Sequence, residues 1–163
     1  MMKRPLQFAI NACGGHPIGV DGDIVFEGVS TDTRQLQPGN LFIALRGENF
    51  DGNQFAEAAL TAGAVAVIVD GKTVAAPRIE VSDGRAALGA LAVAHRAEFE
   101  LPLFAIAGSN GKTSTKEMLA AILRGQFETL HSPASFNNDI GVPSTLLQLE
   151  PRHKAAVLEL GTN

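Results

Sequence analysis

The sequence predicts an α/β fold, with a small N-terminal α/β unit followed by the start of a parallel-sheet unit of the P-loop type. Strand and helix patterns alternate over residues 1–80. An apolar run at 103–107 leads into a glycine-rich loop and then into helical spacing, and a second apolar run follows at 155–161. We therefore expect two domains, residues 1–82 and residues 83–163.

Hydrophobic periodicity and turn residues predict the elements of the first domain. We expect a helix at 6–13 closed by Gly14 and Gly15, strands at 24–29, 41–45, 65–69 and 78–81, and a helix over 55–62 that ends near Gly63. His16 and Pro17 are expected in a turn, and residues 46–53 are expected in a loop.

The second domain is expected to begin with a helix over 83–99, capped by Asp83 and followed by Pro102. His95 is expected to be a packed or half-exposed residue of that helix rather than a ligand. The elements expected next are a strand at 103–107 buried on both faces, a helix from near Thr113 with Met118, Leu119, Ile122 and Leu123 on its apolar face, a strand at 128–131, a polar loop at 132–139, a helix beginning near Pro143 and a buried strand at 155–161.

The segment after the strand at 103–107 has the composition of a phosphate-binding loop. It comprises Gly108, Ser109, Asn110, Gly111, Lys112, Thr113 and Ser114. Glycine permits a positive φ and a close backbone approach, so successive N–H groups can point at phosphate oxygens near the positive end of a helix. We expect Lys112 to contact the β- and γ-phosphates of ATP, and the hydroxyl of Thr113 or Ser114 to bind Mg²⁺.

The loop is shorter than the usual pattern G-x-x-x-x-G-K-[ST], because Ile106 stands where the first glycine is expected. The alternative interpretation is an Asn-Gly turn between two ordinary strands. That interpretation predicts a strand after Lys112, whereas the apolar residues there recur at helical spacing. The order of strand, loop and helix favours phosphate binding.

Glu159 lies at the carboxyl end of its predicted strand, which is the ligand-facing edge of an open α/β sheet and the edge that carries the loop at 108–114. A carboxylate there can hold Mg²⁺ beside the phosphates, as a Walker-B acid does. The alternative is a solvated acid at the end of a strand. We favour the metal site because the phosphate loop lies at the same edge.

Two other polar pairs leave alternatives open. Asn137 and Asn138 can line the same edge, or they can make local turns without any ligand. Arg34 can bind a phosphate with both arms of its guanidinium, or it can pair with Asp32 or with another surface acid. Sequence spacing does not decide between these interpretations.

Composition limits the classes of function. Hydrophobic residues make up 45% and charged residues 18% of the chain, which favours a packed core over disorder. The net charge of -4 offers no basic surface to nucleic acid, and the single cysteine, Cys13, fits a reducing compartment. The N-terminus lacks the long apolar region of a signal peptide, and no apolar run is long enough to span a membrane. We expect a soluble, cytoplasmic protein that binds no nucleic acid and does not insert into membranes.

Several segments together resemble one known family. They are the shortened loop at 108–114, Thr115–Met118, Ser135–Pro143 and Glu159–Asn163, with Asp32–Arg34, Pro38–Leu45 and Gly47–Phe55 nearer the N-terminus. They cover nearly the whole chain and resemble the Mur ligases of bacterial peptidoglycan synthesis. The loop alone fits any Mur ligase or a folylpolyglutamate synthase, whereas Phe136–Pro143 singles out the branch that adds a dipeptide.

The resemblance implies three domains: a UDP-sugar-binding domain, an ATPase-like central domain and a third that resembles a dinucleotide-binding fold. The chain would hold the first domain and the start of the second. We therefore expect it to be the N-terminal piece of a longer, monomeric protein and to have no ligase activity alone. Asn53 stands where many relatives have His, so no role is assigned to it.

The same resemblance implies an activity. The dipeptide-adding branch uses ATP and Mg²⁺ to join D-alanyl-D-alanine to UDP-N-acetylmuramoyl-tripeptide through an acyl phosphate. Lys112 would be catalytic, and Thr113 and Glu159 would bind Mg²⁺. The substrate residues would be Thr33, Arg34, Glu48, Asn49 and Phe50 for the UDP-sugar, and Asn137 and Asn138 in the substrate cleft.

Other functions stay open on the sequence. Another Mur-type ligase, or a P-loop NTPase or kinase, would use the same loop, and the last two would need no amine acceptor. A module that only binds a UDP-sugar would leave the loop without a catalytic role.

Overall fold

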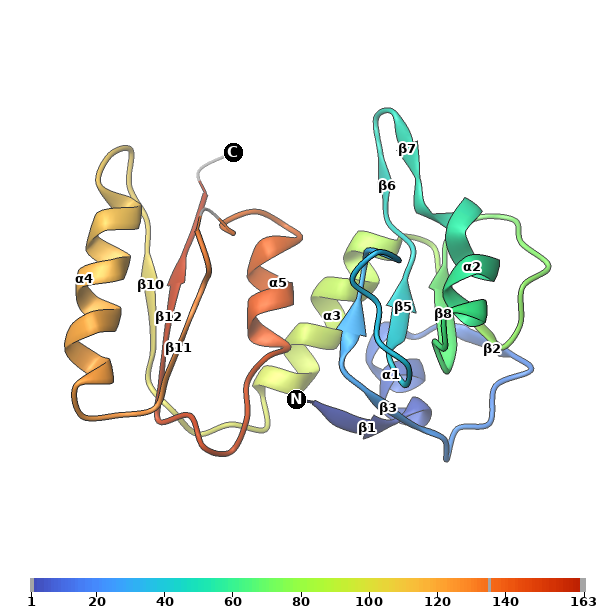
Figure 1. The fold of residues 1–163 in the computed structure, drawn as a ribbon, viewed down its shortest axis with the longest axis horizontal. Coiled ribbons are helices and arrows are strands. Elements are labelled where there is room, and N and C mark those ends of the chain that lie inside the picture. The colour runs from blue at the N-terminus through green and yellow to red at the C-terminus, as the bar shows by residue number, and fades with distance from the viewer. Residues whose placement is uncertain (1, 135, 162–163) are drawn as a thin grey trace. The chain divides into compact units, whose positions relative to one another are not determined.

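The computed structural model describes residues 2–134 and 136–161. The chain divides into two compact units, unit 1 within 1–91 and unit 2 within 92–163. Helix α3 (Gly84–Arg96) spans this division, and the domain boundary near residue 82 stays a prediction. Both units combine helices with sheets that contain parallel strands, as the sequence predicts (Figure 1). No helix in the described parts of the chain is both long enough and apolar enough to cross a membrane.

Unit 1 is built on a five-stranded sheet with the order β2-β9-β8-β5-β4. Four of these strands run parallel, and β2 pairs antiparallel with β9 at the edge. The strands are β2 (His16–Ile18), β4 (Val29–Ser30), β5 (Leu41–Ile43), β8 (Ala66–Val69) and β9 (Arg78–Glu80). Two antiparallel pairs accompany the sheet: β1 (Lys3–Pro5) with β3 (Val25–Glu27), and β6 (Arg46–Gly47) with β7 (Phe50–Asp51).

The helices of unit 1 follow the predicted pattern. Helix α1 (Leu6–Cys13) has the predicted bounds and ends at Gly14, whose φ of 62° is a left-handed helix cap that glycine adopts without steric cost. A 3-10 turn, η1 (Gly52–Phe55), leads into α2 (Ala56–Thr61). The small side chains of α2 pack with Phe42 and Val67 of the sheet in a fully apolar core.

Three expectations for unit 1 are wrong. The strand expected at 24–29 is two strands, because Gly28, with a φ of 81°, separates β3 from β4, and the two pair with different partners. His16 and Pro17 lie in β2 rather than in a turn, since an edge strand tolerates a proline that cannot donate a hydrogen bond. The loop expected at 46–53 contains the β6–β7 hairpin.

Unit 2 contains a three-stranded parallel sheet with the order β10-β12-β11. Its elements are β10 (Leu103–Ile106), α4 (Lys112–Arg124), β11 (Thr129–His131), α5 (Gly141–Leu146) and β12 (Ala155–Glu159). Helices α4 and α5 cover opposite faces of this sheet (Figure 1). Strand β12 lies in the middle and is buried at every position, as its continuous apolar run predicts.

The two ends of α3 confirm two expectations. Asp83 Oδ1 accepts hydrogen bonds from the backbone N–H groups of Arg85 and Ala86, at 2.7 and 3.1 Å, and so caps the helix. His95 is buried, and its Nε2 lies 3.1 Å from the carbonyl oxygen of Leu149. It is therefore a packed helix residue, as the sequence predicts.

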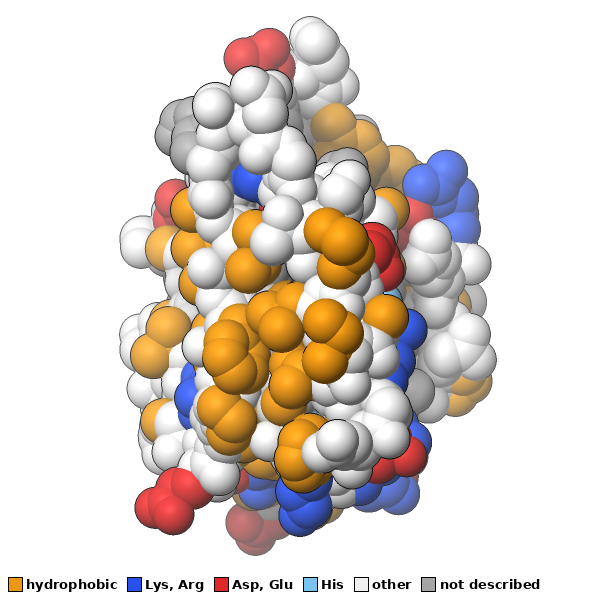
Figure 2. Space-filling view, turned by 90° about the vertical axis from the view of Figure 1, so that its left-hand side faces the viewer, with side chains coloured by type: hydrophobic (Ala, Val, Ile, Leu, Met, Phe, Trp, Pro, Cys, Tyr) orange, Lys and Arg blue, Asp and Glu red, His pale blue; other side chains and the backbone are white. Residues whose placement is uncertain are grey.

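Strand β10 and helix α4 exist as predicted, but their buried faces differ from the prediction. β10 is an edge strand, so Phe104 and Ala105 are exposed rather than buried on both faces. On α4, Met118 and Ile122 face solvent, while Lys116 and Ala120 are fully buried. Figure 2 shows hydrophobic side chains gathered on the side of the molecule where α4 lies. Apolar spacing alone located the helix but not the face that packs.

Candidate nucleotide and metal site

The parallel pairing of β10 and β12 brings the loop at 108–114 and Glu159 to one edge of the sheet. Ile106, the last residue of β10, is the register partner of Glu159, the last residue of β12. The carboxyl ends of parallel strands meet at the edge where open α/β sheets bind ligands. The shared edge that the sequence predicts is therefore present.

The loop backbone uses glycine at the two positions where φ is positive. Gly108 has a φ of 144° and Gly111 a φ of 73°. Gly111 is the N-cap of α4, and it has no side chain that could cap the N–H groups of the first turn. A helix N-terminus that begins at a glycine-rich loop is suited to an anion, because the N–H groups and the helix dipole both favour negative charge.

The side chain of Lys112 folds back onto the glycine-rich loop that precedes it. Its Nζ donates a hydrogen bond of 2.7 Å to the carbonyl oxygen of Gly108, and the side chain is half-buried. The ammonium therefore lies at the mouth of the loop, beside the N-terminus of α4. A positive charge there can stabilise phosphate oxygens.

Glu159 is almost completely buried, and its carboxylate accepts hydrogen bonds from Thr113 of α4 and from Asn137, which precedes α5. Its Oε2 accepts a hydrogen bond of 2.8 Å from Thr113 Oγ1, and its Oε1 accepts one of 2.9 Å from Asn137 Nδ2. Burial, the largest influence, opposes ionisation, but these hydrogen bonds and the charges of Lys116 and Lys112 hold the pKa of Glu159 below its usual value. The carboxylate is therefore ionised at neutral pH.

This donor set suits Mg²⁺ that arrives with a nucleotide. In the described parts of the chain, no group of three or more His, Cys, Asp or Glu residues could hold a metal by itself. Mg²⁺ is usually held by one or two carboxylates with phosphates and water, rather than by a cage made only of protein. Glu159 supplies one carboxylate and Thr113 one hydroxyl, both hard oxygen donors, so the residues fit that type of site.

The two asparagines expected near this edge behave differently. Asn137 reaches Glu159, and its carbonyl oxygen accepts a hydrogen bond of 2.7 Å from the N–H of Gly161. Asn138 Oδ1 instead accepts from the N–H groups of Ile140 and Gly141, at 3.2 and 2.8 Å, at the start of α5. The structure thus brings Asn137 to the edge that carries Glu159 and gives Asn138 a capping contact. Ser135, Thr162 and Asn163 of the quoted motifs lie outside the described residues.

In unit 1, the guanidinium of Arg34 grips Asp32. Arg34 NH2 lies 2.6 Å from Asp32 Oδ2, and Arg34 Nε is 2.9 and 3.1 Å from the two carboxylate oxygens. The hydrogen bonds from the Arg34 side chain and backbone lower the pKa of Asp32 to about 2. Of the alternatives that the sequence left open for Arg34, the structure contains the pair with Asp32. Thr33 lies between the two and is half-buried.

The remaining expected substrate residues lie on the β6–β7 hairpin. Glu48 and Asn49 form its exposed tip. Phe50 is 54% exposed and stacks on Phe55, with ring centroids 5.5 Å apart and an interplanar angle of 15°. The hairpin therefore presents an aromatic pair to solvent.

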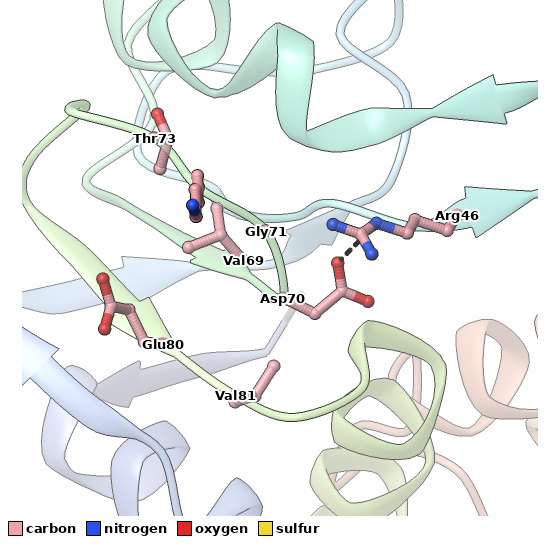
Figure 3. A pocket seen from close by; sticks show the side chains of 8 residues that line it. Arg46, Val69, Asp70, Gly71, Thr73, Glu80 and Val81 are labelled. Carbon is pink, nitrogen blue, oxygen red and sulfur yellow. Dashed lines mark ion pairs between the residues drawn. The ribbon is translucent and has the colours of Figure 1, made fainter.

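Sequence reasoning missed a pocket of about 470 Å³ in unit 1, lined by Arg46, Asp70 and the segment after β8 (Figure 3). Arg46 Nε lies 3.2 Å from Asp70 Oδ1, and the two side chains point toward each other (Figure 3). Asn53 Nδ2 donates to Asp70 and to Asp51, at 2.8 and 2.6 Å. The position of Asp70 and Gly71 directly after a buried strand was the available signal.

Lys116 is a second residue to which the sequence gave no role. It is completely buried, and its Nζ donates to the carbonyl oxygens of Ser132 and Ala134, at 2.8 and 2.7 Å. The spacing of Lys116 places it on the same face of α4 as Ala120, one helical turn later, but nothing in the local sequence marks that face as the buried one.

Two models of one protein family match the chain in sequence. The Mur ligase family catalytic domain matches residues 25–96, and the Mur ligase middle domain matches residues 106–163. A curated relative, the UDP-N-acetylmuramoyl-tripeptide--D-alanyl-D-alanine ligase of Escherichia coli K12, is 48% identical over 142 residues, which cover 86% of this chain and 31% of the relative. The chain spans about a third of the length of the curated relatives it matches.

Solved structures agree with the sequence matches. The crystal structure of MurF from Acinetobacter baumannii superimposes with a TM-score of 0.93 at 35% identity, over 99% of this chain and 36% of that chain. The MurF ligase from Thermotoga maritima, solved in complex with ADP, has a TM-score of 0.75 at 30% identity, over 82% of this chain and 31% of that one. Sequence and structure lead to the same assignment: the chain belongs to the Mur ligase family.

Proposed function

We propose that the protein carrying this sequence is an ATP-dependent ligase that joins D-alanyl-D-alanine to UDP-N-acetylmuramoyl-tripeptide in peptidoglycan synthesis. The observation that carries the proposal is the arrangement of Lys112, Thr113 and Glu159 at one edge of the sheet. Asn137, which bonds Glu159 there, belongs to the motif 136–143 that is typical of the dipeptide-adding branch. The relatives named for this reaction support it.

The proposed chemistry begins with a carboxylate that is too poor an electrophile to react with an amine. An oxygen of the tripeptide carboxylate attacks the γ-phosphorus of ATP, the bond to ADP breaks, and an acyl phosphate forms. The amino nitrogen of D-alanyl-D-alanine then attacks the acyl carbon, phosphate leaves with the electron pair of the broken C–O bond, and the amine loses a proton. The products are an amide, ADP and phosphate.

The residues of unit 2 have clear tasks in this proposal. The loop N–H groups and Lys112 bind and orient the phosphates, and Lys112 stabilises the charge on the transferring phosphoryl group. Thr113 and Glu159 hold Mg²⁺, which supplies further neutralisation of the phosphate charge when it is bound. Asn137 orients the Glu159 carboxylate from the opposite side. The complex of the Thermotoga maritima relative with ADP supports the use of an adenine nucleotide.

Unit 1 would bind the UDP-sugar part of the substrate. The proposed residues are Thr33, Arg34, Glu48, Asn49 and Phe50. Asn137 and Asn138 would lie on the tripeptide side of the substrate cleft, in unit 2. The exposed aromatic face of Phe50 supports binding of the UDP-sugar, because stacking is available to the uracil base. Arg34 would bind a phosphate while sharing its guanidinium with Asp32. We further propose that the protein acts in the cytoplasm as a monomer, without nucleic acid or membrane partners.

The test is phosphate release by the protein expressed from its complete gene, with Mg-ATP. UDP-N-acetylmuramoyl-tripeptide and D-alanyl-D-alanine are added singly and together, and products are identified by mass spectrometry. We expect release that needs both substrates and gives a new amide. Release with neither substrate and no amide would identify an NTPase. Binding of the UDP-sugar peptide without any response to Mg-ATP would identify a binding module, and both outcomes contradict the proposal.

A further inference from the structure

We propose that Lys116 is a positioning residue of the metal edge, which acts by anchoring the segment 132–134 so that Ser132 and Asn137 hold Glu159 in place. This inference rests on the proposed function only in assigning Mg²⁺ to Glu159. A series of hydrogen bonds links the buried Lys116 to the residues that hold the buried carboxylate of Glu159.

Complete burial of Lys116 needs an explanation. A lysine is seldom fully buried, because removing an ammonium from water is costly unless every donor has a partner. Lys116 Nζ donates to the carbonyl oxygens of Ser132 and Ala134, at 2.8 and 2.7 Å, and lies 3.0 Å from Glu117 Oε1. These three partners match the three donors of an ammonium. Two of the three belong to the segment that follows β11.

The anchored segment reaches Glu159 first through Ser132. This serine is completely buried, and its Oγ accepts a hydrogen bond of 3.1 Å from the backbone N–H of Glu159. The N–H of Ser132 donates to the carbonyl oxygen of Val157, also at 3.1 Å. Lys116 therefore holds Ser132, whose side chain and backbone N–H both bond to the end of β12.

The second route runs through the backbone turn at Ala134. Ala134 has a φ of 44°, a left-handed conformation that is strained for a residue with a Cβ. The bond from Lys116 to the Ala134 carbonyl oxygen holds this conformation. Three residues later in the sequence, Asn137 Nδ2 donates to Glu159 Oε1, and the backbone carbonyl oxygen of Asn137 accepts from the N–H of Gly161.

Lys116 thus acts on the carboxylate without touching it. The contacts of Ser132 and Asn137 with Glu159 flank the two carbonyl groups that the ammonium holds. An unbranched apolar residue of similar length, such as methionine, would fill much of the same buried space but would bond neither carbonyl. Without the anchor, Glu159 should remain present but be less well oriented for Mg²⁺.

The experiment measures how strongly Mg²⁺ tightens ADP binding, by calorimetry on the full-length protein. ADP affinity is determined with excess EDTA and then at increasing Mg²⁺, for wild type, Lys116→Met and Lys116→Gln. Loss of a direct partner of a metal ligand weakens metal binding by about 10- to 100-fold. Because Lys116 acts through such partners, we expect a shift of up to that size in the Mg²⁺ dependence. ADP affinity in EDTA should stay near the wild-type value. Lys154→Met makes the same chemical change at an exposed position and should shift neither quantity.

Two more variants show whether Lys116 works through the proposed route. In an Asn137→Ala background, Lys116→Met should cause a much smaller further shift, because residues acting in one network are not additive. Adding Ala134→Gly to Lys116→Gln should recover part of the Mg²⁺ response, since glycine adopts the left-handed turn without the anchor.

The opposite results would overturn the inference. If Lys116→Met loses only thermal stability and keeps the wild-type Mg²⁺ dependence, Lys116 is a packing residue. If the Lys116 variants do not fold, Asn137→Ala carries the test, and an unchanged Mg²⁺ dependence there contradicts the route through Asn137. Failure of the proposed ligase reaction would appear separately, as wild-type protein that binds Mg-ADP but forms no amide.

Discussion

Thr113 Oγ1 donates a hydrogen bond of 2.8 Å to Glu159 Oε2, which joins the first turn of α4 to the last residue of β12 across 46 positions of sequence. The same carboxylate also accepts a bond from Asn137. One buried acid therefore connects the start of α4, the end of the central strand and Asn137. Changes at any of the three elements should affect the site in ways that can be distinguished.

Lys112→Ala should abolish most of the activity while leaving the fold intact. The substitution removes the ammonium beside the loop, and losing one preorganised charge-stabilising group reduces kcat by about 10²- to 10³-fold. Steady-state rates of phosphate release measure the effect, and thermal unfolding checks the fold. Lys154→Ala, at an exposed lysine, should keep wild-type rates. Comparable rates for Lys112→Ala and Lys154→Ala would remove Lys112 from the mechanism.

Glu159→Gln should weaken the use of Mg²⁺ more than it weakens the binding of nucleotide. The amide keeps the size of the side chain but loses the negative charge and one of the two acceptors that Thr113 and Asn137 now bond. We expect the Mg²⁺ concentration for half-maximal rate to rise at least about 10-fold. Glu100→Gln, on the surface, is the matched control. An unchanged Mg²⁺ requirement would mean that Glu159 is a structural acid.

Two glycines should respond to alanine with opposite signs. Gly111 has a φ of 73°, so a Cβ there costs about 1–2 kcal/mol although no atom lies within 4 Å of it. Gly89 lies inside α3, also with no atom within 4 Å, so alanine there should stabilise the protein by about 0.5–1 kcal/mol through a lower backbone entropy in the unfolded state. Urea denaturation measures both. Equal changes for the two variants would contradict the backbone explanation.

The exposed pair of Asp32 and Arg34 predicts a pH response. The folded pKa of Asp32 is about 2, below its ordinary 3.8, because Arg34 donates to it from the side chain and backbone. A carboxyl with a lowered folded pKa stabilises the protein above its unfolded pKa and loses that contribution as the pH falls through about 2. Side-chain NMR should show the Asp32 carboxyl titrating near that value.

In the same titration, Arg34→Gln should return the pKa of Asp32 toward 3.8, because the guanidinium that donates to both carboxylate oxygens is gone. Lys3→Gln breaks the exposed pair with Glu27 and should leave Asp32 unaffected. A pKa for Asp32 that stays low in Arg34→Gln would assign the effect to the backbone N–H instead.

Local signals in the sequence were sufficient for most of the elements. Gly14 ends α1 at the predicted residue, Asp83 caps α3, and the glycine-rich loop lies between a strand and a helix. These features depend on backbone conformations that a few neighbouring residues determine. They were predictable for that reason, and so was the presence of Glu159 at the end of a strand.

The sequence by itself determined the α/β class, the loop at 108–114 and the edge that Glu159 shares with it, because strand direction and glycine conformations are encoded locally. Only the tertiary structure decided that Phe104 and Met118 are exposed, that Arg34 is paired with Asp32 and that Lys116 is buried beside the segment after β11. Which face of a helix packs, and which charge meets which, depend on contacts between residues far apart in sequence, and no local pattern specifies them.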